Sequence, residues 1–123
     1  MSLRGEYAGP TAVIPLVDLN TVGDTPVTVP FAKWYPINMR VYDASTSLAA
    51  SSMTIGLYSA AAAGGTAIVT PATRTALTTA AQVVGSTIAS TIYFTTRTVY
   101  IRVSVAHGSA ATATVALDLL CLE

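Results

Sequence analysis

The sequence predicts an all-β fold, built as a single antiparallel β-sandwich or jelly-roll-like barrel of about eight strands. Short runs alternate between apolar and polar residues, so that one side of each run is apolar. Successive side chains of a strand point to opposite faces of a sheet, and such runs are therefore typical of strands with one buried face. Gly, Pro, Asn and Asp separate the runs at the spacing typical of sandwiches and barrels, and helices do not alternate with the strands.

Length and composition favour one domain that works as part of an assembly. A chain of 123 residues is long enough for a single core. Only 10% of the residues are charged, and the formal net charge is zero. Because a free soluble domain usually carries more surface charge, we expect much of the surface to be covered in the working state, and the alternative is a secreted or merely charge-poor monomer. Glycine and proline interrupt residues 1–10, which we expect to form an N-terminal arm before a sandwich domain at residues 11–123.

Residues 39–70 contain the clearest strand pattern. One sheet face is expected to be buried and to carry Met39, Val41, Met53, Ile55 and Leu57. The opposite face is expected to carry Arg40, Tyr42, Thr54 and Tyr58. Gly64 and Gly65 predict a hairpin turn or a bulge, since the Lys and the helix of a phosphate-binding loop do not follow them.

The preceding part of the chain predicts shorter strands. Residues 11–19 form a strand candidate in which Pro15 indicates an edge strand or a bulge. Its buried face is expected to carry Val13, Val17 and Leu19. Residues 20–26 are expected to form a turn, followed by a short strand at residues 27–29.

Residues 31–35 hold the densest aromatic cluster of the chain. Pro36 follows and argues against a central strand position, because proline lacks the N–H that a ladder needs. Ile37, Met39 and Val41 then resume the alternation, which predicts that they share a buried face.

The C-terminal third predicts two clear strands. The buried side of the first is expected to carry Val99, Ile101, Val103 and Val105. The buried side of the second is expected to carry Val115, Leu117, Leu119 and Cys121. Residues 107–109, His-Gly-Ser, predict a hairpin turn between them. Residues 72–90 are expected to form loop and strand rather than a short helix, because Thr and Val favour pleated surfaces.

The residues that catalysis and metal binding need are few and dispersed, so we expect no enzyme activity, catalytic residue, cofactor or metal. The carboxylates are Glu6, Asp18, Asp24, Asp43, Asp118 and Glu123. Asp18, Asp24 and Asp43 fall at predicted strand ends, where turn and capping roles are usual. His107 is the one histidine and lies in a predicted turn, and the single Cys121 allows neither an intramolecular disulfide nor a cysteine-rich zinc site.

Nucleic acid and membrane are not expected as partners. The basic residues are dispersed, at Arg4, Lys33, Arg40, Arg74, Arg97 and Arg102, and form no stripe that could follow a phosphate backbone. The long uncharged stretch between Asp43 and Arg74 contains Gly, Pro, Ser and Thr, unlike a membrane span. The N-terminus lacks an apolar run of signal-peptide length.

Tyr and Arg on the predicted polar sheet faces are the strongest candidates for binding a partner. Both residue types are enriched at protein contacts, since each has a wide flat body and a polar end. These candidates are Arg40, Tyr42, Tyr58, Tyr100 and Arg102. The alternative is that Tyr simply suits an exposed sheet face. Trp34 and Tyr35 are the second candidate, as a platform for sugar rings or an anchor in a partner, with packing at the core margin as the alternative.

Three segments, MRVYDASTSLAASSMTIGLYSAAAAGGTAIV, TIYFTTRTVYIRVSV and ATATVALDLLCL, are rich in Ala, Thr and Ser and contain no Lys. In this, residues 31–122 resemble the small β-sandwich head decoration (cement) proteins of tailed bacteriophages. The resemblance implies a non-enzymatic virion subunit on the outer capsid surface, present in the host cytoplasm during assembly and often trimeric. Such a homo-oligomer bridges neighbouring subunits of the major capsid protein. Phage tail and fibre modules look similar, so a carbohydrate- or receptor-binding module is the alternative.

Overall fold

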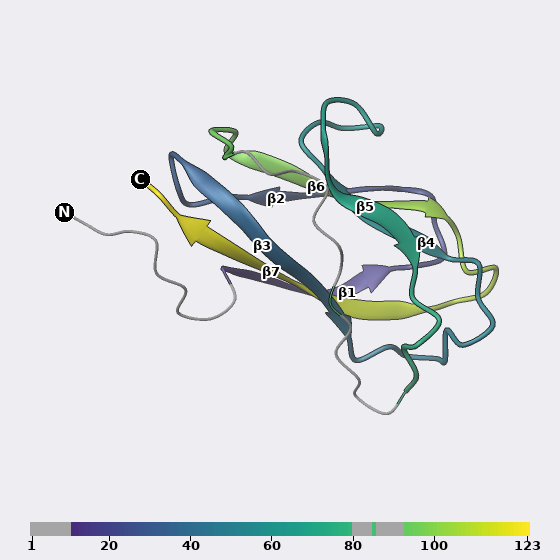
Figure 1. Ribbon diagram of the computed structural model, residues 1–123. Coiled ribbons are helices and arrows are strands. Elements are labelled where there is room, and N and C mark those ends of the chain that lie inside the picture. Colours follow the sequence, from purple (N-terminus) through teal and green to yellow (C-terminus); the bar gives the residue numbers. More distant parts are fainter. Residues whose placement is uncertain (1–10, 80–84, 86–92) are drawn as a thin grey trace.

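The computed structural model describes residues 11–79, 85 and 93–123, which form seven β-strands in two antiparallel sheets (Figure 1). The strands are β1 (Ala12–Asp18), β2 (Gly23–Thr28), β3 (Trp34–Tyr42), β4 (Thr54–Tyr58), β5 (Ala67–Thr73), β6 (Thr98–Val105) and β7 (Thr112–Cys121). The predicted all-β sandwich is confirmed, with seven strands in the described residues where about eight were expected. The arm predicted at residues 1–10 lies outside the described residues.

Most connections carry the chain from one sheet to the other. The three-stranded sheet has the order β1-β7-β3, and the four-stranded sheet has the order β2-β6-β4-β5. Within the described residues, β4 and β5 are the one consecutive pair of strands that bond to each other. The hairpin predicted at residues 107–109 is therefore wrong. The chain does turn there, with Gly108 at a φ of 102°, but it passes from β6 in one sheet to β7 in the other.

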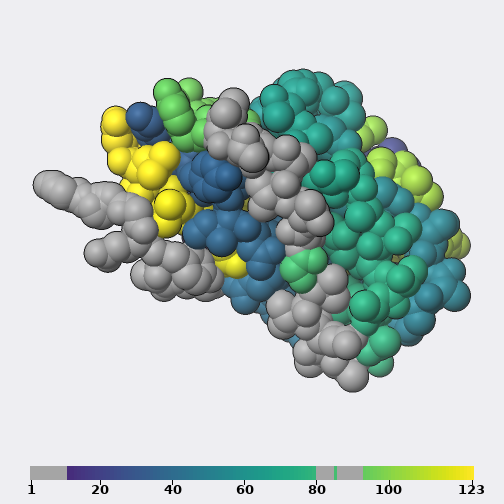
Figure 2. Space-filling view, in the orientation of Figure 1, coloured from purple at the N-terminus to yellow at the C-terminus, as the bar shows by residue number. Residues whose placement is uncertain are grey.

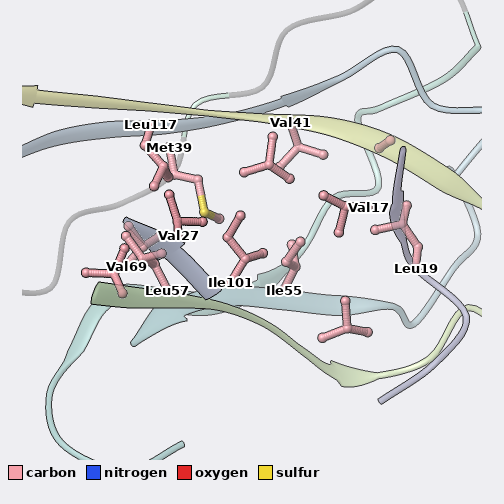
Figure 3. Packing of buried hydrophobic residues seen from close by; sticks show 14 of the residues in the cluster. Val17, Leu19, Val27, Met39, Val41, Ile55, Leu57, Val69, Ile101 and Leu117 are labelled. Atoms are coloured by element: carbon pink, nitrogen blue, oxygen red, sulfur yellow. The ribbon is translucent and has the colours of Figure 1, made fainter. Parts of the chain in front are cut away.

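The core lies between the two sheets and receives side chains from both (Figure 3). The three-stranded sheet contributes Met39, Val41, Val115, Leu117 and Leu119. The four-stranded sheet contributes Val27, Ile55, Leu57, Ile68, Val69, Val99, Ile101 and Val103. The apolar residues predicted within residues 39–57 are buried as expected, but β3 and β4 place them on the facing sides of two sheets rather than on one sheet face. Alternation predicts that a side chain is buried, and it does not predict which sheet carries it.

A bulge in β1 changes which of its residues are buried. The pairing of β1 with β7 shifts register between Ile14 and Val17, and Leu16 has a φ of 57°. Val17 is buried as predicted, but Val13 is 48% exposed, while Ile14 packs against the core instead. The edge position and the bulge expected from Pro15 are both confirmed, and the bulge reverses the alternation that precedes it.

A second bulge affects β3, which is an edge strand as Pro36 indicates. The register of β3 against β7 shifts between Pro36 and Asn38. Met39 and Val41 are buried as predicted, whereas Ile37 is 38% exposed. The extra residue in the bulge turns Ile37 away from the face that the alternation assigns to it.

Two further strand boundaries and the exposure of one residue differ from the predictions. β2 already begins at Gly23, so the predicted turn at residues 20–26 is shorter, and Pro26 is accommodated because β2 is an edge strand. Val105, at the end of β6, is 43% exposed rather than buried. β5 extends to Thr73, and the strand pieces expected on either side of Gly85 lie outside the described residues.

The hairpin predicted at Gly64 and Gly65 joins β4 to β5, but alanines occupy its tightest point. The N–H of Gly64 donates to the carbonyl of Ala61 at 3.0 Å, and the two residues between them, Ala62 and Ala63, have φ values of 58° and 61°. Two central residues with positive φ define a type I′ turn, which normally uses Asn-Gly. Gly65 is also required, because its φ is 64° and a Cβ there would lie 2.4 Å from the Ser59 hydroxyl.

Candidate interaction surfaces

The outer face of the four-stranded sheet, called here the four-strand face, brings two of the predicted tyrosines together. Tyr58 on β4 and Tyr100 on β6 are directly opposite each other in the antiparallel register. Pro26 on β2 is opposite Tyr100 on the other side and is exposed. Directly opposed residues share a sheet face with Cβ atoms about 5 Å apart. Both tyrosines are half-buried, and the register places the rings of the three residues in a row across β4, β6 and β2.

Asp24 connects the four-strand face to the hairpin tip. Its Oδ1 accepts a hydrogen bond from Nη1 of Arg102 at 3.2 Å, and its Oδ2 accepts one from the backbone N–H of Ala62 at 2.9 Å. Asp24 lies on β2, whereas Ala62 lies between β4 and β5, and β6 separates β2 from β4. The hairpin tip therefore folds back across the outer side of β6.

The outer face of the three-stranded sheet, called here the three-strand face, carries a bidentate ion pair. Nε of Arg40 donates to Oδ2 of Asp118 and Nη2 donates to Oδ1, both at 2.9 Å. Asp118 is only 3% exposed and the neighbouring outward residue Ala116 is fully buried. Gly85 lies against this face as well, because a Cβ there would be 3.2 Å from Oδ1 of Asn38. Ala116 and Asp118 on this face are therefore shielded from solvent, whereas Arg40 and Tyr42 are half-buried.

The structure divides the predicted Tyr and Arg candidates between opposite sides of the molecule. Arg40 and Tyr42 lie on the three-strand face, while Tyr58, Tyr100 and Arg102 lie on the four-strand face. They were predicted as one kind of surface, but they do not form one continuous patch. The cause is the β3–β4 connection, which carries the chain from one sheet to the other.

Trp34 is a core residue and not a surface platform. Its side chain is fully buried, its Nε1 donates to the carbonyl of Thr96 at 2.8 Å, and its ring stacks on Phe94 with centroids 5.1 Å apart. Trp34 and Phe94 also exchange two backbone hydrogen bonds of 2.9 and 2.7 Å. The sugar platform proposed for Trp34 and Tyr35 therefore loses its larger ring, and the alternative of core packing holds for Trp34. Tyr35 points to the other side of β3 and is half-buried.

The C-terminal residues form backbone hydrogen bonds beside the start of β3, where yellow and blue atoms meet in Figure 2. The N–H groups of Ala32 and Lys33 donate to the carbonyl of Glu123, and the N–H groups of Leu122 and Glu123 donate to that of Lys33. The ammonium of Lys33 lies 4.3 Å from the ring centroid of Tyr93 and 3.7 Å from a carboxylate oxygen of Glu123. Cys121, predicted to face inward, is half-buried.

The loops at one end of the sandwich form a hydrogen-bonded network. Ser51 Oγ lies 2.7 Å from Nδ1 of His107 and also accepts the N–H of Met53 at 3.0 Å. The backbone N–H of His107 donates to the carbonyl of Leu19, which joins the β6–β7 connection to the residue that follows β1. Asp18 accepts hydrogen bonds from Asn20 N–H and Thr21 hydroxyl, as expected for a turn residue, and these bonds lower its pKa. Among the described residues, no three His, Cys, Asp or Glu side chains are grouped so that they could hold a metal ion.

Two structural features escaped the sequence analysis. The role of Asp118 as the partner in an ion pair could have been predicted, because Asp118 is an acid on the outward side of β7, whose other residues are mostly apolar. The burial of Arg74 had no such signal, since it follows β5 in a segment without regular alternation.

Comparisons with known proteins gave no relatives: no family model, no curated protein and no solved structure matches this chain. The described residues also include no helix with the length and apolar character that a membrane span requires.

Proposed function

We propose that this chain is a non-enzymatic structural protein of a tailed-phage virion, which decorates the outer capsid surface and stabilises the shell by bridging subunits of the major capsid protein. The observation that supports this most directly is the four-strand face. It combines the opposed Tyr58 and Tyr100 rings, the exposed Pro26 and the Arg102–Asp24 pair on a chain of zero net charge. Tyrosine and arginine of this kind supply much of the binding free energy at protein interfaces.

The proposed mechanism is mass action. A protein that binds the mature shell and not its dissociated subunits stabilises the shell by its binding free energy. A homo-oligomer, for which we propose a trimer, would present several copies of the four-strand face at once. Binding at one copy then raises the effective concentration of the others, so weak individual contacts become strong together.

The test is co-sedimentation of the purified protein with expanded capsids of the virus that encodes it, together with light scattering to determine its oligomeric state. We expect saturable binding by a trimer. The double variant Tyr58→Ser/Tyr100→Ser should weaken binding at least about tenfold, because buried tyrosines at interfaces commonly contribute 2 kcal/mol or more. Tyr42→Ser is the matched control, since it removes a half-buried tyrosine from the three-strand face and should leave binding unchanged.

Three results would count against the proposal. A monomer that fails to sediment with expanded capsids would overturn it as a whole. Binding that Tyr42→Ser reduces as much as the double variant would overturn the assignment of the four-strand face. Binding to glycans in place of capsids would favour the carbohydrate-binding alternative.

A further inference from the structure

The guanidinium of Arg74 is buried at the end of β5, with 5% of the residue exposed. Its Nη1 donates to the carbonyl of Thr73 at 3.2 Å, and its Nη2 lies 3.4 Å from the carbonyl of Ile55. Nε is buried and has no hydrogen-bond partner among the described residues. Burial disfavours the charged form and lowers the pKa of Arg74.

None of the ion pairs in the described part of the chain includes Arg74. The three pairs are Lys33–Glu123, Arg40–Asp118 and Arg102–Asp24. The carboxylate of Asp18 is engaged by Asn20 and Thr21. Outside the described ranges the sequence holds only one acidic residue, Glu6. A buried charge is costly unless it is paired, so a buried guanidinium with a free N–H calls for an anion.

The Arg40–Asp118 pair shows which anion binds well to the Nε and Nη2 side of a guanidinium. Arg40 uses Nε and Nη2 together to hold the two oxygens of the Asp118 carboxylate, each at 2.9 Å. In Arg74 the same Nε is unpartnered, and the same Nη2 makes only a long contact of 3.4 Å. The planar fork of Nε–H and Nη2–H matches the spacing of carboxylate oxygens. We propose that Arg74 is a binding site for a small carboxylate, held by Nε–H and Nη2–H.

The site is independent of the capsid proposal, and its direct test needs no variant. The Nε–H resonances of the arginines are followed by ¹H–¹⁵N NMR of the wild-type chain during titration with sodium formate, with sodium chloride at equal ionic strength as the reference. We expect the Arg74 resonance to shift along a saturable curve with a Kd no tighter than about 1 mM, the limit for so small a ligand. The resonances of Arg40 and Arg97 should not follow this curve. An unmoved Arg74 resonance, or an equal response to chloride, would overturn the proposal.

A thermal unfolding experiment provides the second readout. A ligand that binds only the folded state raises its Tm. Formate should therefore raise the Tm of the wild type above the value in chloride, and Arg74→Met should abolish this difference. Arg97→Met is the matched control, because Arg97 is exposed and its Nε already donates to the carbonyl of Val29 at 3.0 Å. A formate effect that survives in Arg74→Met would contradict the site.

The carboxylate could also come from the chain itself, and Glu6→Gln distinguishes this source. If the site takes a carboxylate from solution, the Kd for formate is the same with and without Glu6. If Glu6→Gln tightens the apparent formate affinity tenfold or more, Glu6 competes for Arg74, and the solution source is overturned.

Discussion

The outer faces of the two sheets carry the same residue types in different roles. On the three-strand face, Arg40 makes a bidentate pair with Asp118, which is 3% exposed. On the four-strand face, Arg102 makes a single 3.2 Å contact with Asp24, and both side chains are about one-fifth exposed. Both arginines are two residues from a tyrosine on the same strand. The difference shows that a polar residue on the outward side of a strand can stabilise the fold, as Arg40 does, and is not necessarily there to bind a partner.

The largest expected effect comes from breaking the pair on the three-strand face. Asp118→Ala removes a carboxylate whose side chain is only 5% exposed and breaks both hydrogen bonds to Arg40, and we expect a loss of about 2 kcal/mol in the free energy of unfolding. Urea denaturation of the wild type and the variant measures this loss. Replacing both partners, in Arg40→Met/Asp118→Leu, should recover most of it, because no buried charge is then left unpaired. A loss below about 1 kcal/mol in Asp118→Ala would mean that the two faces are energetically alike.

A smaller effect, of opposite sign, is expected at the hairpin tip that folds over the four-strand face. Ala62 and Ala63 both adopt positive φ, which costs an L-residue with a side chain about 1 kcal/mol or more. Ala62→Asn/Ala63→Gly introduces the residues that a type I′ turn prefers and should raise the free energy of unfolding by about 1 kcal/mol. The N–H of residue 62 remains available to Asp24. Unchanged thermal and urea midpoints would show that the turn relaxes in solution.

The sequence was sufficient to predict the fold class and the buried side of most strands. The burial of six residues was predicted correctly, because alternation follows from strand geometry alone: Met39, Val41, Ile55, Leu57, Val99 and Ile101. Val13 and Ile37 were misplaced because the bulges beside Pro15 and Pro36 each add one residue to a strand. Such a shift depends on the partner strand, which a local pattern does not contain.

Less of the candidate interaction surface could be predicted. Tyr58 and Tyr100 are opposite each other because β6 lies between β2 and β4. Strands this far apart in the sequence leave no local pattern that predicts their pairing. The same holds for the separation of Arg40 and Tyr42 from Arg102, which follows from the crossing between sheets after β3. Local chemistry predicted which residues point outward, and long-range pairing decided which of them meet.

The corresponding substitution on the four-strand face should have a smaller effect than Asp118→Ala. Asp24→Ala removes the contact with Arg102 and the hydrogen bond from Ala62. Because Asp24 is about one-fifth exposed and a single 3.2 Å contact joins it to Arg102, we expect a loss of no more than about 1 kcal/mol. Amide hydrogen exchange should show faster exchange at Ala62, with the strands unaffected. A loss equal to that of Asp118→Ala would remove the energetic distinction between the faces.

The smallest effect is expected at Asp18. This residue lies on neither outer face but at the connection from β1 to β2, so its effect is a reference for the substitutions on both faces. Hydrogen bonds from the Asn20 N–H, and then from the Thr21 hydroxyl, lower its pKa below the ordinary value of 3.8. A carboxylate with a lowered folded-state pKa stabilises the fold fully above its unfolded pKa, and this contribution is lost as the pH falls through the folded pKa. Asp18→Asn should therefore make the free energy of unfolding depend less steeply on pH, and only below about pH 4. In that range the Asp18 carboxylate is protonated in the unfolded chain before it is protonated in the folded chain. Carboxyl ¹³C NMR should give a midpoint for Asp18 below 3.8, and a midpoint at or above that value would mean that the turn opens before the carboxylate is protonated.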